Sequence, residues 1–259
     1  MSSNIVFTKE SGVATIRLNR PEKKNALSVA MYGALGDAIE EAERDDSVGA
    51  VLLCAAGESF TAGNDLADFA NRPRDGVSPA QRFLFGIAQA KKPLVAAIDG
   101  YAVGVGFTML LHCDLIYAST RAKLRAPFVD LGLIPEAAST LLLPRLIGHA
   151  RAAELFLLGD TLSAEQAKEF GLVNAVLPPA EVEAHARAVC ERLALKAPTA
   201  LLQTKRLLRD TTGTTLERMQ TEFEIFATQL GSPEAREAIA AFFDKRQPNF
   251  SKPPKASST

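Results

Sequence analysis

The chain has 259 residues, a formal net charge of −1 and a hydrophobic content of 47 %, which is ample for the core of one large domain or of a domain with an appendage. No basic stripe favours nucleic acid, no apolar run approaches the roughly 18 residues of a membrane span, and the first residues do not resemble a signal peptide. Three cysteines in apolar segments indicate buried thiols in a cytoplasmic protein, and no Cys or His spacing predicts a metal site.

The first part of the chain alternates short apolar runs with helical patterns. Ser11-Gly12 indicates a hairpin, and Ser28 is typical of the N-cap of a helix that runs to about Arg44. The predicted elements before residue 99 are strands at 5–8 and 13–18, a helix at 29–44, a strand at 48–55, a glycine turn at 57–63, a helix at 79–90 and a strand at 94–98.

A second glycine turn occupies residues 99–106. A helix over 107–111, a strand over 113–118 and a helix opened by Pro135 are predicted after it. The order strand, glycine turn, helix, strand therefore occurs twice. This repetition predicts an α/β core with parallel strands.

The pattern becomes almost wholly helical after Pro178-Pro179. We expect a core of residues 1–195 and a C-terminal helical oligomerisation region of residues 196–259 that ends in a disordered tail. Aromatic residues in these helices favour a face that covers another subunit. They are Phe223, Phe226, Phe242 and Phe243.

Two glycine turns and one carboxylate are the candidate catalytic groups. Backbone N–H groups in residues 60–66 and 99–106 could point at one carbonyl oxygen and stabilise an enolate, while Glu136 moves its proton. Each feature also has a structural interpretation. A glycine turn can simply start a helix, and a carboxylate after Pro135 can cap one. Asp130 is interpreted as structural or solvated.

Short sequence motifs occur in a characteristic order along the chain. They are 18–21 (LNRP), 25–27 (NAL), 62–66 (AGNDL), 92–97 (KPLVAA), 100–102 (GYA), 113–118 (CDLIYA) and 171–173 (GLV). These motifs resemble those of the crotonase (enoyl-CoA hydratase/isomerase) superfamily over roughly residues 5–250. The resemblance implies a crotonase-type spiral of ββα units with a helical C-terminal region, assembled as a trimer or a dimer of trimers.

The resemblance implies an acyl-CoA thioester as substrate, with CoA as part of that substrate and no separate cofactor. By position in the family motifs, the oxyanion N–H groups belong to Asn64 and Val105. The segment 23–27 matches the one that lies along CoA. The residues that the resemblance assigns to CoA or acyl binding are Lys23, Lys24, Ala26, Leu27, Ala62, Asp65, Leu66, Thr108 and Phe128.

Two departures from the hydratase pattern narrow the implied reaction. Thr108 and Phe128 stand where hydratases carry glutamates, and neither side chain can deliver a proton to water. Glu136 matches the single acid of Δ3,Δ2-enoyl-CoA isomerases and of related ring-opening isomerases of aromatic-acid degradation. The resemblance therefore implies that the chain converts 3-enoyl-CoA into 2-enoyl-CoA in fatty acid metabolism, with Glu136 as proton shuttle.

Other functions stay open at this point. One class comprises a hydratase, a dienoyl-CoA isomerase or another enolate-forming member. A second class is a non-catalytic member that binds acyl-CoA or RNA. The intact glycine turns, Glu136 and the lack of a basic patch weigh against this second class.

Overall fold

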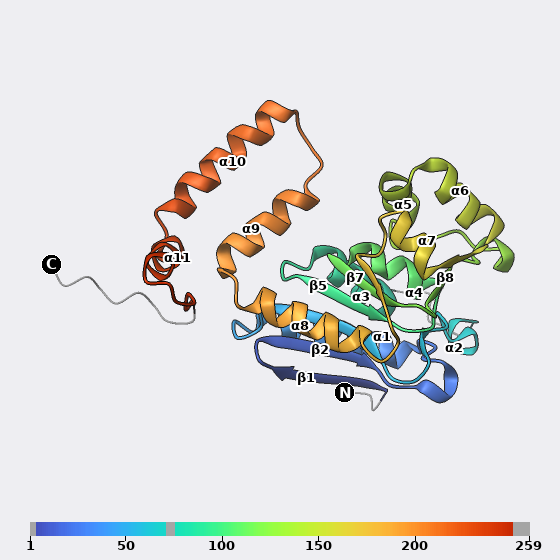
Figure 1. The fold of residues 1–259 in the computed structure, drawn as a ribbon. Coiled ribbons are helices and arrows are strands. Elements are labelled where there is room, and N and C mark those ends of the chain that lie inside the picture. Colours follow the sequence, from blue (N-terminus) through green and yellow to red (C-terminus); the bar gives the residue numbers. More distant parts are fainter. Residues whose placement is uncertain (1–3, 71–75, 251–259) are drawn as a thin grey trace. The chain divides into compact units, whose positions relative to one another are not determined.

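The computed structural model describes residues 4–70 and 76–250 and divides the chain into two compact units, Met1–Glu191 and Arg192–Thr259 (Figure 1). The first unit combines sheets and helices, and the second is helical. The tail that we expect to be disordered, residues 251–259, lies outside the described residues.

Two sheets organise the described part of the first unit (Figure 1). The larger has the strand order β1-β2-β3-β5-β7-β10, with an antiparallel β1–β2 hairpin and otherwise parallel pairs. The smaller has the order β4-β6-β8-β9, in which only β8 and β9 are antiparallel. The predicted parallel α/β core is confirmed. The strands are β1 (Ile5–Glu10), β2 (Val13–Leu18), β3 (Ala50–Ala55), β4 (Ser59–Thr61), β5 (Leu94–Ile98), β6 (Tyr101–Val103), β7 (Leu115–Ser119), β8 (Lys123–Arg125), β9 (Thr161–Ser163) and β10 (Ala175–Leu177).

Polar N-caps set the starts of two of the longer helices in this unit, Val29–Arg44 and Pro79–Gln89. The Ser28 hydroxyl accepts a hydrogen bond from the Met31 N–H at 3.2 Å, and Ser78 forms a capping box with Gln81. The helices are α1 (Val29–Arg44), α2 (Leu66–Ala70), α3 (Pro79–Gln89), α4 (Val105–Thr108), α5 (Ser139–Ile147), α6 (His149–Leu158), α7 (Ala164–Glu169) and α8 (Val182–Ala194), with 3-10 turns η1 (Pro21–Lys23), η2 (Met109–His112) and η3 (Val129–Leu131).

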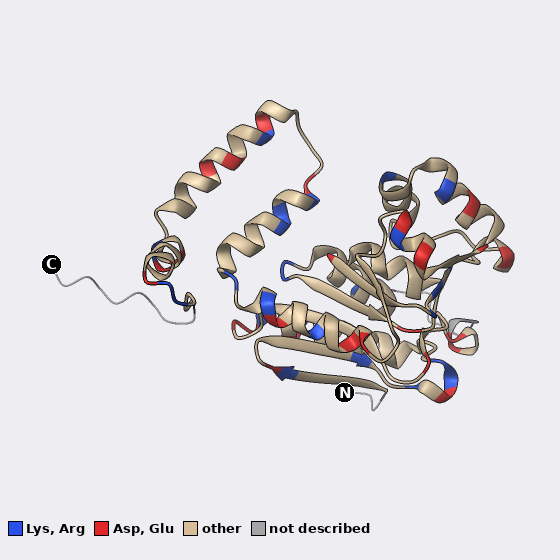
Figure 2. Cartoon of the chain, viewed as in Figure 1, with Lys and Arg blue, Asp and Glu red and all other residues tan. Residues whose placement is uncertain are grey.

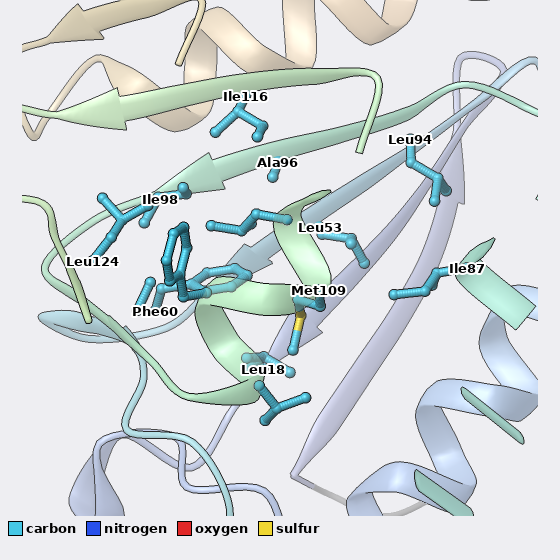
Figure 3. Close-up of a cluster of buried hydrophobic side chains, with 14 of the residues drawn as sticks. Leu18, Leu53, Phe60, Ile87, Leu94, Ala96, Ile98, Met109, Ile116 and Leu124 are labelled. Atoms are coloured by element: carbon cyan, nitrogen blue, oxygen red, sulfur yellow. The ribbon is translucent and has the colours of Figure 1, made fainter. Parts of the chain in front are cut away.

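Side-chain alternation along the strands gives the larger sheet two buried faces. On one face, Leu18, Leu53 and Ile98 belong to the core cluster that the sheet shares with α1, α3 and α4 (Figure 3). On the other face, Arg17 donates two hydrogen bonds to Glu183 of α8, at 2.8 and 2.5 Å. Helices thus cover both faces, because the connections between parallel strands cross over the faces of the sheet.

The segment after Pro135 differs from the prediction. Helix α5 begins at Ser139, because Ala137 and Ala138 have left-handed backbone angles, with φ of 55° and 54°. No side chain caps this helix. Glu136 therefore lies in a turn ahead of α5, and the interpretation of its carboxylate as a helix cap is wrong.

The second unit consists of α9 (Pro198–Arg209), α10 (Thr215–Leu230) and α11 (Pro233–Phe243). Thr214 caps α10 through a capping box with Glu217, and Ser232 caps α11. Figure 2 shows Lys and Arg interspersed with Asp and Glu along the ribbon of each unit. Among the described residues, no helix is long and apolar enough to cross a membrane.

Candidate active site

The two glycine turns lie against each other. Residues of β4 and β6 lie within these turns, and the two strands are parallel neighbours in the smaller sheet. The contact leaves no room for a side chain. A Cβ atom on Gly63 would lie 2.9 Å from the Val103 carbonyl oxygen, and one on Gly106 would lie 2.3 Å from Thr61 Cγ2. Glycine at these two positions therefore permits the close backbone approach that brings both turns into one site.

Each turn presents a backbone N–H without an acceptor in the described chain. Asn64 pairs with Leu27, but the hydrogen bonds of this bridge come from the N–H groups of Leu27 and Asp65. Val105 is the first residue of α4, and a first-turn N–H has no acceptor within its own helix. The structure thus brings the two predicted donors to neighbouring turns, and their oxyanion role stays a prediction.

Glu136 supplies the carboxylate of this region. Its Oε1 accepts a hydrogen bond from the Thr108 hydroxyl at the end of α4. Its Oε2 is buried and has no hydrogen-bond partner among the described residues. Burial raises the pKa of Glu136, and the hydrogen bond from Thr108 opposes part of that rise. The carboxylate can therefore take up and release a proton closer to neutral pH than an exposed glutamate can.

Tyr32 of α1 is a residue of this region that the sequence analysis missed. Its hydroxyl donates a 2.5 Å hydrogen bond to Asn64 Oδ1. Burial raises the pKa of the phenol well above its ordinary value, and the charge of Glu136 raises it further. Tyr32 is thus a neutral donor that orients the Asn64 side chain. In the sequence Tyr32 is one of several residues on the buried face of a helix, and no local signal distinguishes it from its neighbours on that face.

Residues 23–27, the segment predicted to lie along CoA, form backbone hydrogen bonds with the first glycine turn. The Ala62 N–H donates to the Lys24 carbonyl at 2.9 Å, and the Leu27 N–H donates to the Gly63 carbonyl at 2.8 Å. Lys23 and Lys24 are exposed, so that their ammonium groups are available to an anion. The structure therefore places this segment beside the proposed donors.

The other predicted binding residues occupy different environments. The Asp65 carboxylate pairs with Arg20 at 2.8 Å, and this contact holds its pKa below the usual range. Leu66 is 61 % exposed, whereas Phe128 is buried within the core cluster. Ala26 accepts a hydrogen bond from Arg20 on its carbonyl oxygen. Substrate contacts of these residues stay predictions.

The strand order and the paired glycine turns define an α/β protein of the crotonase fold class. The family model described as enoyl-CoA hydratase/isomerase matches residues 8–253. A similar solved structure is the enoyl-CoA hydratase/isomerase of Pseudoalteromonas atlantica T6c, with 45 % identity and a TM-score of 0.79 over 96 % of this chain and 100 % of that one. The chain belongs to the enoyl-CoA hydratase/isomerase family.

Curated relatives carry different activities in their names. The 1,2-epoxyphenylacetyl-CoA isomerase of Escherichia coli K12 is 36 % identical and is matched over 96 % of this chain and 99 % of its own length. The 2,3-dehydroadipyl-CoA hydratase of the same organism is 31 % identical, over 96 % and 98 %. The protein is thus an enzyme of this family that acts on acyl-CoA thioesters, while the particular reaction must be argued from its own residues.

Proposed function

We propose that this protein is an enoyl-CoA isomerase that shifts the double bond of a 3-enoyl-CoA to give the 2-enoyl-CoA. The observation that carries the proposal is the carboxylate of Glu136, whose Oε2 atom is buried and has no hydrogen-bond partner among the described residues. Thr108 and Phe128 occupy the positions where a hydratase would need further acids.

The reaction starts with the thioester oxygen between the N–H groups of Asn64 and Val105. Glu136, as carboxylate, removes a proton from the α-carbon of the acyl group. The electron pair of that C–H bond moves into a dienolate, whose negative charge the two N–H dipoles stabilise. The same carboxyl group then returns the proton to the γ-carbon, which leaves the double bond between the α- and β-carbons. No atom is gained or lost.

One acid suffices because no water is added to the substrate. Removal and return of the proton use the same group in its two protonation states, and a pKa raised by burial brings these two states closer in free energy at neutral pH. The reaction therefore requires no group beyond those described and the CoA thioester itself.

The exposed lysines near the first glycine turn support a binding mode for CoA. Lys23 and Lys24 stand within the segment that is bonded to Ala62 and Gly63. Ammonium groups at this place suit the phosphates of CoA, since charge-assisted hydrogen bonds to phosphate are strong. We infer that the CoA moiety lies along residues 23–27, with its thioester directed toward Asn64 and Val105.

The test is a panel of 3-enoyl, 2-enoyl and dienoyl thioesters given to the wild-type protein and to Glu136→Gln. We expect isomerisation of the 3-enoyl thioester by the wild type and a loss of about 10²–10⁴-fold in the variant, as for removal of a general base. Asp130→Asn is the matched control, because Asp130 pairs with Arg125 at the surface. Hydration of the 2-enoyl thioester in place of isomerisation, or an unchanged rate in Glu136→Gln, would overturn the proposal.

A further inference from the structure

The two oxygens of Glu136 have different surroundings. Oε1 accepts from the Thr108 hydroxyl, and Thr108 itself is fully buried. Oε2 is also out of contact with solvent, yet no described group donates to it. A buried polar atom without a partner is costly, so that its presence calls for a functional explanation. An acceptor that is left open is suited to receive a proton from a bound substrate.

The backbone of the turn that carries Glu136 makes a second contact. Ala137 and Ala138 both have left-handed backbone angles, which alanine adopts at a cost. The His112 ring donates from Nε2 to the Ala137 carbonyl at 2.9 Å, and His112 is buried. Since a carbonyl oxygen can only accept, this nitrogen carries the hydrogen. The contact helps to keep the turn in a conformation that its alanines do not favour.

Both contacts come from one short stretch of chain. Thr108 is the last residue of α4 and His112 is the last residue of η2, which follows α4 directly. The same stretch begins at Val105, the proposed oxyanion donor. One buried segment therefore sets the position of the donor and that of the carboxylate.

We propose that Thr108 and His112 are positioning residues that hold Glu136 by its Oε1 and by the following carbonyl, so that Oε2 alone carries the proton. The substrate of this proton transfer rests on the proposed function, whereas the two contacts do not. In this arrangement Thr108 does not touch the substrate, and its hydroxyl acts through Glu136.

The electrostatic consequence has a definite sign. A hydroxyl that donates to the carboxylate favours its charged form, so that removal of the hydroxyl raises the pKa of Glu136 beyond the rise that burial already causes. Further titratable groups face this turn from two elements. They are Tyr32 on α1, whose phenol is neutral, and His112 on η2.

The first experiment measures the titration of Glu136 directly, by NMR of isotope-labelled carboxyl carbons with the signal assigned from its loss in Glu136→Gln. Thr108→Val keeps the side-chain shape without the hydroxyl, and we expect the midpoint to rise by about one pH unit. Thr108→Ser keeps the hydroxyl and should restore the wild-type midpoint. Thr15→Val is the matched control, because Thr15 is a buried threonine whose hydroxyl instead accepts from Arg187.

The second experiment measures exchange of the α-proton of a saturated acyl-CoA with deuterated solvent. His112→Leu removes the ring donor, and we expect kcat for exchange to fall by up to about 10²-fold at little change in KM, because a displaced base loses its alignment. His112→Gln offers a donor of similar reach and should recover most of the rate. If His112 only supported the fold, His112→Leu would lower the melting temperature without lowering kcat for exchange at unchanged KM.

The outcomes separate this inference from the proposed function. If the wild type does not isomerise a 3-enoyl thioester but the Glu136 midpoint rises in Thr108→Val and returns in Thr108→Ser, the proposed reaction fails and the positioning role stands. If isomerisation is confirmed but the midpoint in Thr108→Val equals that of the wild type, the positioning role of Thr108 is wrong. Equal exchange kinetics in His112→Leu and the wild type would remove His112 from the proposal.

Discussion

The two units of the chain bury apolar side chains very differently. The first unit contains a continuous core in which side chains such as Phe60, Phe83 and Phe107 are at most 1 % exposed. In the described part of the second unit, only Lys205 and Ala241 are buried. Its large apolar residues are exposed instead, with Phe223 at 63 % and Phe226 at 65 %.

The exposed residues of α10 follow a regular helical spacing. Leu216, Met219, Phe223, Phe226 and Leu230 recur at intervals of three and four residues, which places them along one side of the helix. Helix α10 is therefore amphipathic, but its apolar side is exposed and does not pack on a hydrophobic core within the second unit. The N-caps of α10 and α11 mark where these helices begin, whereas their apolar faces require another surface to cover them. We propose that this surface belongs to other copies of the chain, in a trimer or a dimer of trimers.

After the loss of Glu136, the loss of an oxyanion donor in the first unit should have the largest effect on turnover. Val105→Pro removes one backbone N–H, and we expect turnover to fall by about 10²–10³-fold because one oxyanion donor is lost. Proline is tolerated at the first position of a helix, where Val105 lies, so that the melting temperature should change little. Val105→Ile retains the N–H and serves as control. A folded Val105→Pro protein with wild-type turnover would falsify the assignment of this donor.

The exposed apolar stripe of α10 should form the contact between copies of the chain. Phe223→Ser with Phe226→Ser should dissociate the assembly, because it removes two large side chains from the exposed stripe of α10. Light scattering measures the mass against the 27.7 kDa of one chain. The matched control is Phe85→Ser, an aromatic residue of the first unit that is 59 % exposed. A wild-type protein that is already monomeric at micromolar concentration contradicts the proposed assembly.

The smallest expected effect is a difference in pH-dependent stability between two glutamates. The pKa of Glu136 is raised by burial, so its contribution to stability is full below the ordinary glutamate pKa and is lost as pH rises through the raised value. Glu136→Gln cannot ionise. We therefore expect its melting temperature to match that of the wild type below the ordinary glutamate pKa of 4.5 and to exceed it near pH 8.

Glu237 of the second unit should show the opposite sign. Hydrogen bonds from Arg246 lower the pKa of Glu237 to about 2. The contribution of Glu237 to the stability of the fold is therefore present above the ordinary glutamate pKa and is lost as pH falls toward the lowered pKa. Glu237→Gln should lower the melting temperature slightly at neutral pH, since solvent screens a surface pair. Calorimetry at several pH values measures both variants. The same sign of the pH dependence for both would contradict the burial argument for Glu136.

Local signals in the sequence predicted the longer elements well. The N-cap Ser28 and the strand Leu94–Ile98 were located at their observed positions, because capping and β-branched apolar runs act within a few residues. The helix predicted at Pro135 was wrong, because two left-handed alanines carry no local mark. The three-residue strands β8 and β9 were not predicted, since such short strands form only through their sheet partners.

Some features of the candidate site also follow from local sequence, and others follow from packing. The glycine turns, the family and the choice of Glu136 as the candidate acid could be read from the sequence, because they depend on residue type and order along the chain. Only the tertiary structure decided that Thr108 donates to Glu136 across 28 positions and that Tyr32 donates to Asn64 across 32. The physical reason is that a hydrogen bond between distant segments depends on how the sheets and helices pack, and burial sets the pKa of Glu136 only after that packing exists.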